Sequence, residues 1–339
     1  MHLTAIIDEN IVTRVNNVTQ ADLATILKLD RSSVSLALSG SLKVSEKTRC
    51  RVQEAAQRMN YRPNLAARQL KSTQPVILAL MIPETFETLS EPIVVMTLQA
   101  LAQQAADKGI MLNILTETMV LRTIDNPSFI LPNGIFVWGD VEAKIITNNI
   151  FKGLPFQVLD PTHQSYEAYD FPSVNIDNFG GAQAVTQHLI ARGAERLLFV
   201  IGAPEHLGHQ KRLEGARKAW NLQPMKAEMT VCVFDDLTST QLDEFISKPG
   251  GAVFCSNDTT AILIWQQLIQ KGISIPEQVL LAGFDNTPAA QLIGLTSAVF
   301  DCDTFARAAM ETLLQLIDTS GRVIQPEPIP VILHTGETT

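Results

Sequence analysis

The sequence has few cysteines, no long apolar run and no export signal. The cysteines form no Cys-x-x-Cys pair, so neither a zinc site nor a disulfide framework is indicated. No apolar run reaches about 18 residues, the length that a membrane-spanning helix needs. Residues 1–17 carry Asp8 and Glu9 and lack the basic, apolar and small-residue order of a signal peptide. These absences favour a reducing, cytoplasmic location. The four cysteines are Cys50, Cys232, Cys255 and Cys302.

Catalytic motifs are also missing. There is no Gly-x-Ser-x-Gly, no His-Glu-x-x-His and no glycine-rich loop of the kind that binds phosphate. The six histidines show no spacing typical of metal ligands. We therefore expect no catalytic residues, no metal site and no cofactor.

Acidic residues outnumber basic ones, but the charge is unevenly distributed. The 339 residues carry a formal net charge of −9. Residues 11–72 hold 11 Lys or Arg against 4 Asp or Glu, whereas residues 73–339 hold 15 bases against 29 acids. A basic N-terminal block on an acidic body indicates either a module that contacts a polyanion or a solvated basic face.

Three short helices are predicted within the basic block. Residues 19–22 fit a capping box, and Leu23, Ile26 and Leu27 follow at helical spacing. A second helix is predicted over residues 31–38, and a third begins near Ser45. Three short helices, the first two joined by a tight turn, are typical of a helix-turn-helix unit, although other small helical bundles share the pattern.

Strands and helices alternate from Pro75 onward. The apolar run 76–82 is typical of a strand buried on both faces of a parallel sheet. Alternation over about 265 residues predicts doubly wound parallel sheets in two lobes. Further strands are predicted at 111–115, 134–138, 156–159, 196–201, 230–234, 251–255 and 279–284. Helices are predicted at 92–107, 181–191, 211–220 and 259–270.

Polar residues follow several of these strands. Because ligands of such folds bind beyond the carboxyl ends of the strands, these residues are candidates for a binding site. They are Asp160, Asp177, Asn257, Asp258 and Asp285.

The second predicted helix carries side chains that its core face does not need. A recognition helix presents such residues to base edges, where Arg can pair with guanine and an apolar side chain can contact a thymine methyl. The candidates are Arg31, Ser32, Ser35 and Leu36. Arg31 could instead contact a phosphate or solvent. Hydroxyls near helix starts could donate to phosphates, cap the helices, or do both; these belong to Thr19, Ser33, Ser45 and Thr48.

The residues of these segments resemble the lactose-repressor/galactose-repressor (LacI/GalR) family of bacterial transcription regulators over about residues 18–338. In the N-terminal part the resemblance rests on Val18-Thr19, Asp22-Leu23-Ala24, Ser33-Val34-Ser35, Leu38-Ser39-Gly40, Val44-Ser45, Thr48-Arg49, Asn60 to Asn64 and Ala67 to Leu70. In the body it rests on Pro172-Ser173-Val174, Asp177-Asn178, Gly181-Ala182, His188 to Ile190, Gly202, Arg212 to Gly215, Ser256-Asn257-Asp258, Ile275-Pro276-Glu277 and Ala282 to Asp285.

The resemblance implies an all-α helix-turn-helix headpiece with a hinge helix, and an α/β effector domain like the two-lobed type I periplasmic binding proteins. We accordingly expect an N-terminal extension (1–17), a headpiece (18–62), a hinge helix with linker (63–75) and an effector-binding and dimerisation domain (76–339). The N-lobe would comprise about 76–175 and 303–320, and the C-lobe about 176–302 and 321–339. A homodimer on a pseudo-palindromic operator is also implied, and the absence of a leucine-repeat tail favours a dimer over a tetramer.

The family also assigns roles to individual positions. Its main specificity positions correspond to Arg31, Ser32 and Leu36. Leu70 matches the leucine wedge of a hinge helix that opens the minor groove, although it could instead pack within the linker. The other predicted hinge contacts are Asn64, Ala67, Arg68 and Lys71. A helix of about eight residues is marginal in water, so we expect the hinge to fold on DNA.

In the effector domain, Arg212, Asn257 and Asp285 match the ligand-anchoring positions of the family. Trp138, Asp160 and Ile176 match positions that line the pocket. Such a set can hydrogen-bond a polyol and stack on a sugar ring. Arg212 could alternatively clamp a carboxylate or phosphate, or form an ion pair with Asp285. His206 and His209, which precede Arg212, could reach the ligand, but they are interpreted as surface histidines.

Four departures from the family pattern stand out. Lys28 occupies the turn position that is usually Gly, and Asp30 stands where a Ser or Thr cap is common. Residues 91–94 read Glu-Pro-Ile-Val where Asn-Pro-Phe-Phe is frequent, so aromatic ligand platforms are missing there. Residues 336–339 read Gly-Glu-Thr-Thr in place of Arg-Glu-Ser-Thr.

These features predict a cytoplasmic, sequence-specific transcriptional regulator, a repressor, that binds double-stranded operator DNA as a homodimer. A small-molecule effector, a sugar or sugar derivative bound between the lobes, would control its operator affinity. The alternative is a solute-binding protein for a small molecule without a DNA role, which would leave the basic block unexplained. A sugar-processing enzyme would need paired catalytic carboxylates or a nucleotide loop.

Overall fold

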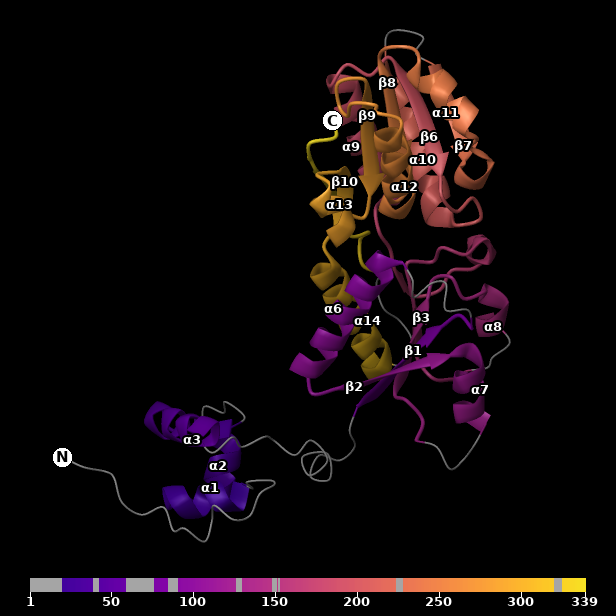
Figure 1. Ribbon diagram of the computed structural model, residues 1–339. Helices are drawn as coiled ribbons and strands as arrows, with labels where there is room; N and C mark the ends of the chain where they lie inside the picture. Colours follow the sequence, from indigo (N-terminus) through magenta and orange to yellow (C-terminus); the bar gives the residue numbers. More distant parts are fainter. Residues whose placement is uncertain are drawn as a thin grey trace, which may run out of the picture. The chain divides into compact units, whose positions relative to one another are not determined.

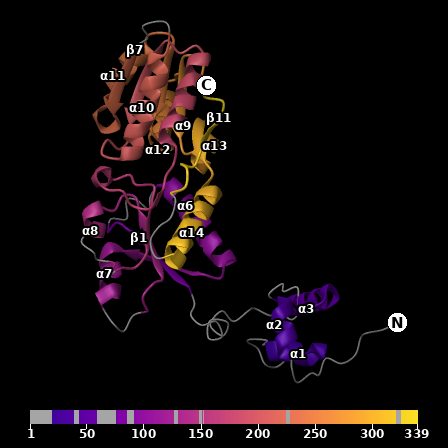
Figure 2. The same ribbon diagram turned by 180° about the vertical axis from the view of Figure 1, so that it is seen from behind.

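The computed structural model describes residues 20–38, 43–58, 76–84, 91–125, 130–147, 151, 153–223, 228–319 and 325–339. The chain divides into two compact units, residues 1–75 and residues 76–339 (Figures 1 and 2).

The N-terminal unit contains helices α1 (Gln20–Leu27), α2 (Arg31–Leu38) and α3 (Glu46–Arg58). Its small core is drawn from all three helices, with Leu23, Val34 and Val52 fully buried. Asp30 begins α2, because its Oδ1 accepts the backbone N–H of Ser33 at 2.8 Å. The three helices predicted from the basic block are therefore present and pack together.

The turn between α1 and α2 contains a residue in the left-handed region. Lys28 has φ +51°, its N–H donates to the carbonyl of Thr25 at 3.3 Å, and Leu29 N–H donates to Ala24 at 2.9 Å. This pair of bonds is a Schellman motif, in which the left-handed position favours glycine. Arg51 of α3 ties the same turn down, since its Nη2 donates to the Leu27 carbonyl at 2.8 Å.

The first lobe of the larger unit is a five-stranded parallel sheet in the order β2-β1-β3-β4-β5. In chain order it contains β1 (Ile77–Ile82), α6 (Pro92–Asp107), β2 (Met111–Thr116), α7 (Glu117–Asp125), β3 (Gly134–Trp138), α8 (Ala143–Thr147), β4 (Phe156–Leu159), η1 (Gln164–Ala168) and β5 (Ser173–Val174). Leu78 and Leu80 of β1 pack on one face, beneath α6, while Ala79 and Met81 pack on the other, beneath α7 and α8. Covering both faces explains why the strand is continuously apolar.

The second lobe is a six-stranded sheet in the order β11-β10-β9-β8-β6-β7. In chain order it contains α9 (Asn178–Ala191), β6 (Arg196–Ile201), α10 (Leu207–Asn221), β7 (Glu228–Val233), η2 (Phe234–Asp236), α11 (Ser239–Ile246), β8 (Gly251–Cys255), α12 (Asp258–Gln270), β9 (Val279–Phe284), α13 (Pro288–Leu292), β10 (Thr296–Phe300) and β11 (Val331–His334). Helices α9 and α10 cover one face, and α11, α12 and α13 cover the other. Strand β11 is antiparallel to β10, so the sheet is not purely parallel as the sequence pattern predicts.

Helix α14 (Cys302–Thr319) connects the two lobes in an order that departs from the chain order. It follows β10 of the second sheet, yet its residues Phe305, Met310 and Leu313 join the core of the first sheet beside α6 (Figure 1). The chain then returns to the second sheet at β11, and on the way Ile329 pairs with Ile176. The chain thus passes between the lobes three times.

Candidate functional site

A cavity of about 270 Å³ lies between the two lobes of the larger unit. Its wall is formed largely by residues that follow strands, as expected at the carboxyl ends of parallel sheets. The six residues that the sequence assigned to an effector site all line it: Trp138, Asp160, Ile176, Arg212, Asn257 and Asp285. Residues from both lobes therefore meet around one space.

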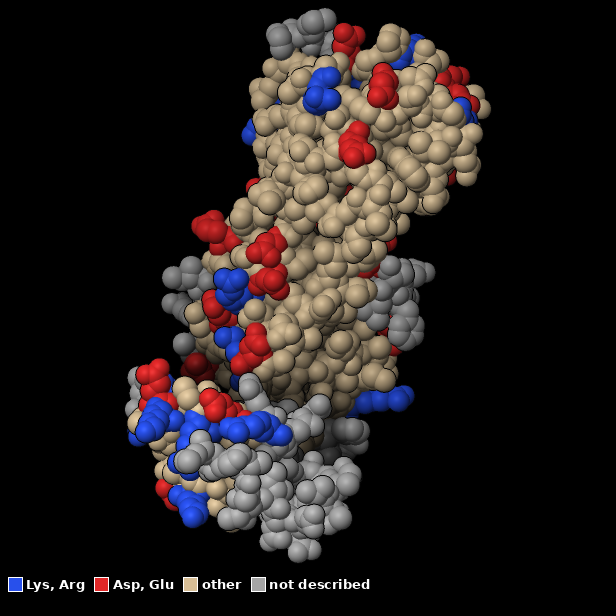
Figure 3. All heavy atoms as spheres, turned by 60° about the vertical axis from the view of Figure 1, so that its left-hand side comes forward, with Lys and Arg blue, Asp and Glu red and all other residues tan. Residues whose placement is uncertain are grey.

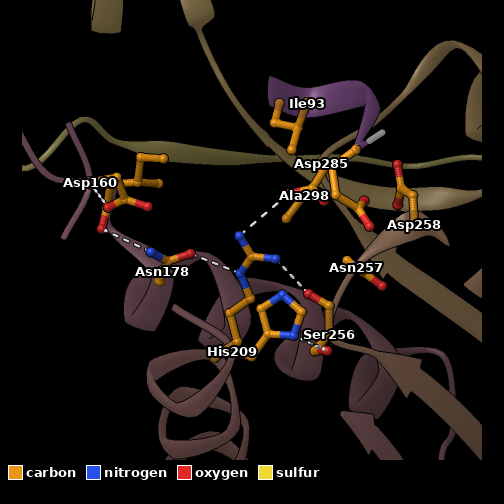
Figure 4. Close-up of polar contacts among 12 residues, drawn as sticks. Ile93, Asp160, Asn178, His209, Ser256, Asn257, Asp258, Asp285 and Ala298 are labelled. Atoms are coloured by element: carbon orange, nitrogen blue, oxygen red, sulfur yellow. Dashed lines mark hydrogen bonds and ion pairs between the residues drawn. The ribbon is translucent and has the colours of Figure 1, made fainter. Parts of the chain in front are cut away.

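Arg212, on α10, is buried at the centre of a polar network (Figure 4). Its Nε donates to Asn178 Oδ1 at 2.8 Å, and its Nη1 donates to the Ser256 carbonyl at 2.5 Å. Its Nη2 lies 3.4 Å from Asp285 Oδ1, and the guanidinium stacks 3.7 Å above the Phe284 ring centroid. The protein thus fixes the orientation of this cation at the cavity wall.

Asp285 follows β9 and takes an unusual backbone conformation with φ +112°. Its N–H donates to the Ala298 carbonyl at 2.6 Å, and this bond to β10 holds the residue in place. Oδ1 is buried and accepts no hydrogen bond from the described residues. Burial raises the pKa of this carboxyl. Arg212 lowers that pKa, and the neighbouring carboxylates raise it again. Strained backbone and an unsatisfied buried oxygen are both features of ligand sites.

Asp160 follows β4 in the first lobe and also lies in the left-handed region, with φ +46°. Its Oδ1 accepts the N–H of Ile176 at 3.2 Å, which ties β4 to the first crossing between the lobes. Burial raises the pKa of Asp160 to about 6. The group therefore titrates within the range of ordinary buffers.

His209 is buried, so its interpretation as a surface histidine is wrong. The hydroxyl of Ser256 bonds its Nδ1 at 2.9 Å, and the N–H of Ala203 donates to the same nitrogen at 3.1 Å. These partners satisfy the ring within the second lobe, which local sequence could not reveal. His206 is half-buried and lies beside Asp140, with 3.7 Å between Nε2 and Oδ1. Burial lowers the pKa of both histidines, so both are neutral at pH 7.

The other assigned residues have distinct positions. Asn257 begins α12, because its Oδ1 accepts the Thr260 N–H at 3.0 Å. Trp138 ends β3 and is half-buried against the cavity. Asp258, next to Asn257, faces away and accepts from Ser297 Oγ and Thr287 N–H, each at 2.7 Å. Asp177 is a helix cap for α9, with its Oδ1 2.8 Å from Gly180 N, and does not line the cavity.

Several cavity residues were not assigned from the sequence. Glu91 and Thr97 lie at the start and middle of α6, and Phe300 and Phe305 lie at the end of β10 and within α14. The position of Phe300 at a strand end is a signal that could have identified it. Phe305 gives no such signal, since only the tertiary path of α14 brings it to the first lobe.

In the N-terminal unit, Arg31, Ser32 and Ser35 are exposed on α2 and Leu36 is half-buried. Ser33 Oγ donates to Asp30 Oδ2 at 2.6 Å, Ser32 also bonds Asp30, and Ser45 Oγ lies 2.8 Å from Thr48 Oγ1. Ser45 caps α3, since its Oγ accepts the Thr48 N–H at 3.2 Å, whereas the hydroxyls of Ser32 and Ser33 bond the α2 cap residue Asp30. Lys and Arg side chains gather over this unit, in blue in Figure 3. The remaining predicted contacts, Thr19, Asn64, Ala67, Arg68, Leu70 and Lys71, lie outside the described residues.

No group of three or more His, Cys, Asp or Glu side chains in the described ranges is arranged to hold a metal ion. None of the helices in the described part of the chain is long and apolar enough to span a membrane.

Comparisons with known proteins cover both units. Residues 22–64 match the model of the lacI family of bacterial regulatory proteins, and residues 186–339 match that of a periplasmic binding protein-like domain. The chain is 25% identical to the transcriptional regulator CelR of Thermobifida fusca over 92% of this chain and 94% of that one. It is 28% identical to the sucrose operon repressor of Escherichia coli over 92% of this chain and 98% of that one.

Solved structures show the same fold. A complex of the transcriptional regulator CelR with cellobiose superposes with a TM-score of 0.66 at 20% identity, over 95% of this chain and 100% of that one. A lac repressor dimer bound to operator and an anti-inducer gives 0.64 at 20% identity, over 95% and 99%.

A helix-turn-helix headpiece joined to a two-lobed ligand-binding fold defines a DNA-binding transcriptional regulator. The chain is similar to the lacI family of such regulators, and the curated relatives named above are regulators rather than enzymes.

Proposed function

We propose that this regulator represses transcription by binding a pseudo-palindromic operator as a homodimer in the cytoplasm, and that a sugar bound between the lobes alters its operator affinity. The observation that carries the effector part is the convergence of Trp138, Arg212 and Asp285, from two lobes, on one cavity. Hydrogen-bonding groups beside an aromatic wall suit a polyhydroxylated ring. Relatives whose names mention cellobiose and sucrose support a sugar.

The DNA part of the proposal rests on the exposed face of α2. Arg31, Ser32 and Ser35 are available to base edges, and the hydroxyls of Ser45 and Thr48 lie at a helix start suited to phosphate contacts. Asn64 to Lys71 would form the hinge, with Leu70 as a wedge in the minor groove. A solute-binding role alone would leave the headpiece without a purpose.

The test begins with operator selection from random palindromic DNA by the full chain. Fluorescence anisotropy at several salt concentrations should then give a steep decrease of affinity with salt, with a log–log slope of roughly −0.9 per neutralised phosphate. Addition of a sugar identified by thermal shift should change the operator affinity, because a ligand that binds the native protein raises its stability. A slope near zero would contradict the DNA role, and an unaltered operator affinity would contradict the effector role.

A further inference from the structure

The charge on the wall of the interlobe cavity is strongly one-sided. Four carboxylates line it: Glu91, Asp140, Asp160 and Asp285. One guanidinium, Arg212, faces them, and no lysine is among the described residues that form the wall. His206 and His209 also line it but are neutral at pH 7, because burial lowers the pKa of each. Lys211, next to Arg212, is exposed and is not part of the wall.

The single cation is already engaged with groups of the protein. Its Nε and Nη1 donate to Asn178 and Ser256, its Nη2 lies 3.4 Å from Asp285 Oδ1, and its face lies on Phe284. The three polar partners are labelled in Figure 4. A phosphate or carboxylate that approached Arg212 from the cavity would have to share Nη2 with Asp285 and would lie among the other carboxylates of the wall. Juxtaposition of like charges disfavours that arrangement.

Partial protonation does not reverse this balance. Burial raises the pKa of Asp160 to about 6, and it also raises that of Asp285. If both carboxyls held a proton, Glu91 and Asp140 would still outnumber the one guanidinium. The cavity therefore has no net positive charge at pH 7 in either state.

Two buried polar atoms of the cavity wall need hydrogen-bond partners. Asp285 Oδ1 and His206 Nδ1 have none among the described residues. Hydroxyl groups of a ligand can supply those hydrogen bonds without bringing charge. Glu91 contributes a further carboxylate at the edge of the cavity, where its Oε2 accepts a hydrogen bond from Thr259 Oγ1 of the other lobe at 3.0 Å.

We infer that the effector is an uncharged, hydroxyl-rich molecule, and that the cavity rejects phosphorylated and carboxylated sugars, with Glu91 and Asp140 as determinants of that rejection. This inference rests on the proposed effector function of the same cavity. For any sugar and its phosphate ester, the inference predicts that the uncharged sugar is the ligand.

The test uses the full chain and its three tryptophans, Trp138, Trp220 and Trp265, all of which lie in the larger unit. Their fluorescence reports on that unit and not on phosphate bound by the basic headpiece. Glucose, galactose, ribose, cellobiose and sucrose are each titrated beside their phosphate esters, and glucose also beside glucuronate, at constant ionic strength. Inorganic phosphate is titrated against chloride as a probe that needs no knowledge of the effector.

A neutral sugar that binds at least about 100-fold more tightly than its phosphate ester supports the inference. Tighter binding of an ester or of glucuronate than of its neutral parent overturns it, while a sugar-class effector would stand. If no sugar binds, the proposed sugar effector fails, and the phosphate probe still decides the charge preference. Saturable quenching by phosphate would then overturn the inference, and its absence would support it.

A charge-neutralised variant tests the named determinants. Glu91→Gln together with Asp140→Asn should narrow the discrimination between a sugar and its phosphate ester by about tenfold or more, or permit phosphate to bind. The matched control is Glu244→Gln, at an exposed position on α11 that does not line the cavity. Unchanged discrimination in a folded double variant would contradict the role of these two carboxylates.

Discussion

Lys28 occupies a backbone conformation, φ +51°, that an L-residue adopts at a cost of about 1 kcal/mol. Lys28→Gly should therefore raise the free energy of local opening of α1 and α2 by about that amount, because glycine lacks the β-carbon that clashes. Hydrogen exchange of the Leu29 amide, which donates to Ala24 at 2.9 Å, measures this opening. Lys28→Ala is the control and should give no such gain; an equal gain would show that charge, not backbone strain, is the cause.

Asp160 gives the unfolding equilibrium a defined pH dependence. Burial raises the pKa of Asp160 from its ordinary value of 3.8 to about 6 in the folded chain. The folded state therefore keeps the proton over a pH range in which the unfolded state releases it. Between about pH 4 and pH 6 the free energy of unfolding should therefore fall as pH rises, by up to about 3 kcal/mol from this group.

Urea denaturation of the wild type and of Asp160→Asn across this range isolates the contribution, since the amide does not titrate and its oxygen can still accept from Ile176. The free energy of unfolding of the wild type, relative to that of Asp160→Asn, should fall as pH rises from 4 to 6. A difference that stays constant from pH 4 to pH 6 would show that Asp160 has an ordinary pKa.

At the scale of elements, the exposed start of α2 provides the test of DNA reading. Arg31→Ala should cost about 1–3 kcal/mol on the selected operator and relax preference at one base pair, if Arg31 pairs with guanine. Arg58→Ala, at the exposed end of α3 where Arg58 pairs with Glu54 at 3.4 Å, is the matched control. Binding competition on operator variants distinguishes the outcomes, because an equal loss on all sequences would identify Arg31 as a phosphate contact.

Local sequence predicted the elements whose burial pattern is uniform. The apolar strands β3, β4, β6, β8 and β9 begin and end where the sequence pattern places them, because both faces of each are covered. Helix α10 begins at Leu207, four residues before the predicted start at 211, and His206 at its N-cap position makes no side-chain cap hydrogen bond. Helices α7, α11 and α14 were not predicted. Helix α11 carries a local signal, the capping box of Thr238 and Gln241, whereas α14 packs on a sheet whose strands lie far away in the sequence.

The cavity residues also divide into those that the sequence predicts and those that depend on the tertiary fold. Residues at strand ends, such as Asp160 and Asp285, could be predicted from topology and family resemblance. The buried His209 could not, because its satisfaction depends on Ser256, 47 residues away in the sequence. The antiparallel pairing of β11 with β10 likewise depends on a return across the lobes that no local pattern encodes.

At the scale of the whole molecule, the two ligands should influence each other equally. If a sugar changes operator affinity by a given factor, linkage requires the operator to change sugar affinity by the same factor, typically about 5–150-fold in allosteric proteins. Titration of the sugar into free and operator-bound protein measures it. Unequal factors under identical conditions would mean that additional states, such as changes in oligomer, enter the cycle.

The predicted hinge adds a second observable at this scale. A helix over residues 64–71 is too short to be stable alone, so its amides should become protected from exchange with operator DNA and not with non-specific DNA. Leu70→Ala should remove most of the preference for the operator while salt-dependent binding persists. Equal protection of these amides in the free protein would contradict coupled folding.

The path of α14 has a consequence for how the protein is made. The first lobe is almost fully translated by residue 174, yet Phe305, Met310 and Leu313, which complete its core, belong to a helix that ends at residue 319. At about 5–20 residues per second, the ribosome needs roughly 7 to 30 further seconds to complete this helix. During that interval the face of the first sheet beneath α6 lacks the part of its cover that α14 supplies, while most of the second lobe is synthesised. The nascent chain is therefore expected to depend on chaperone protection of its N-terminal half until translation is nearly finished.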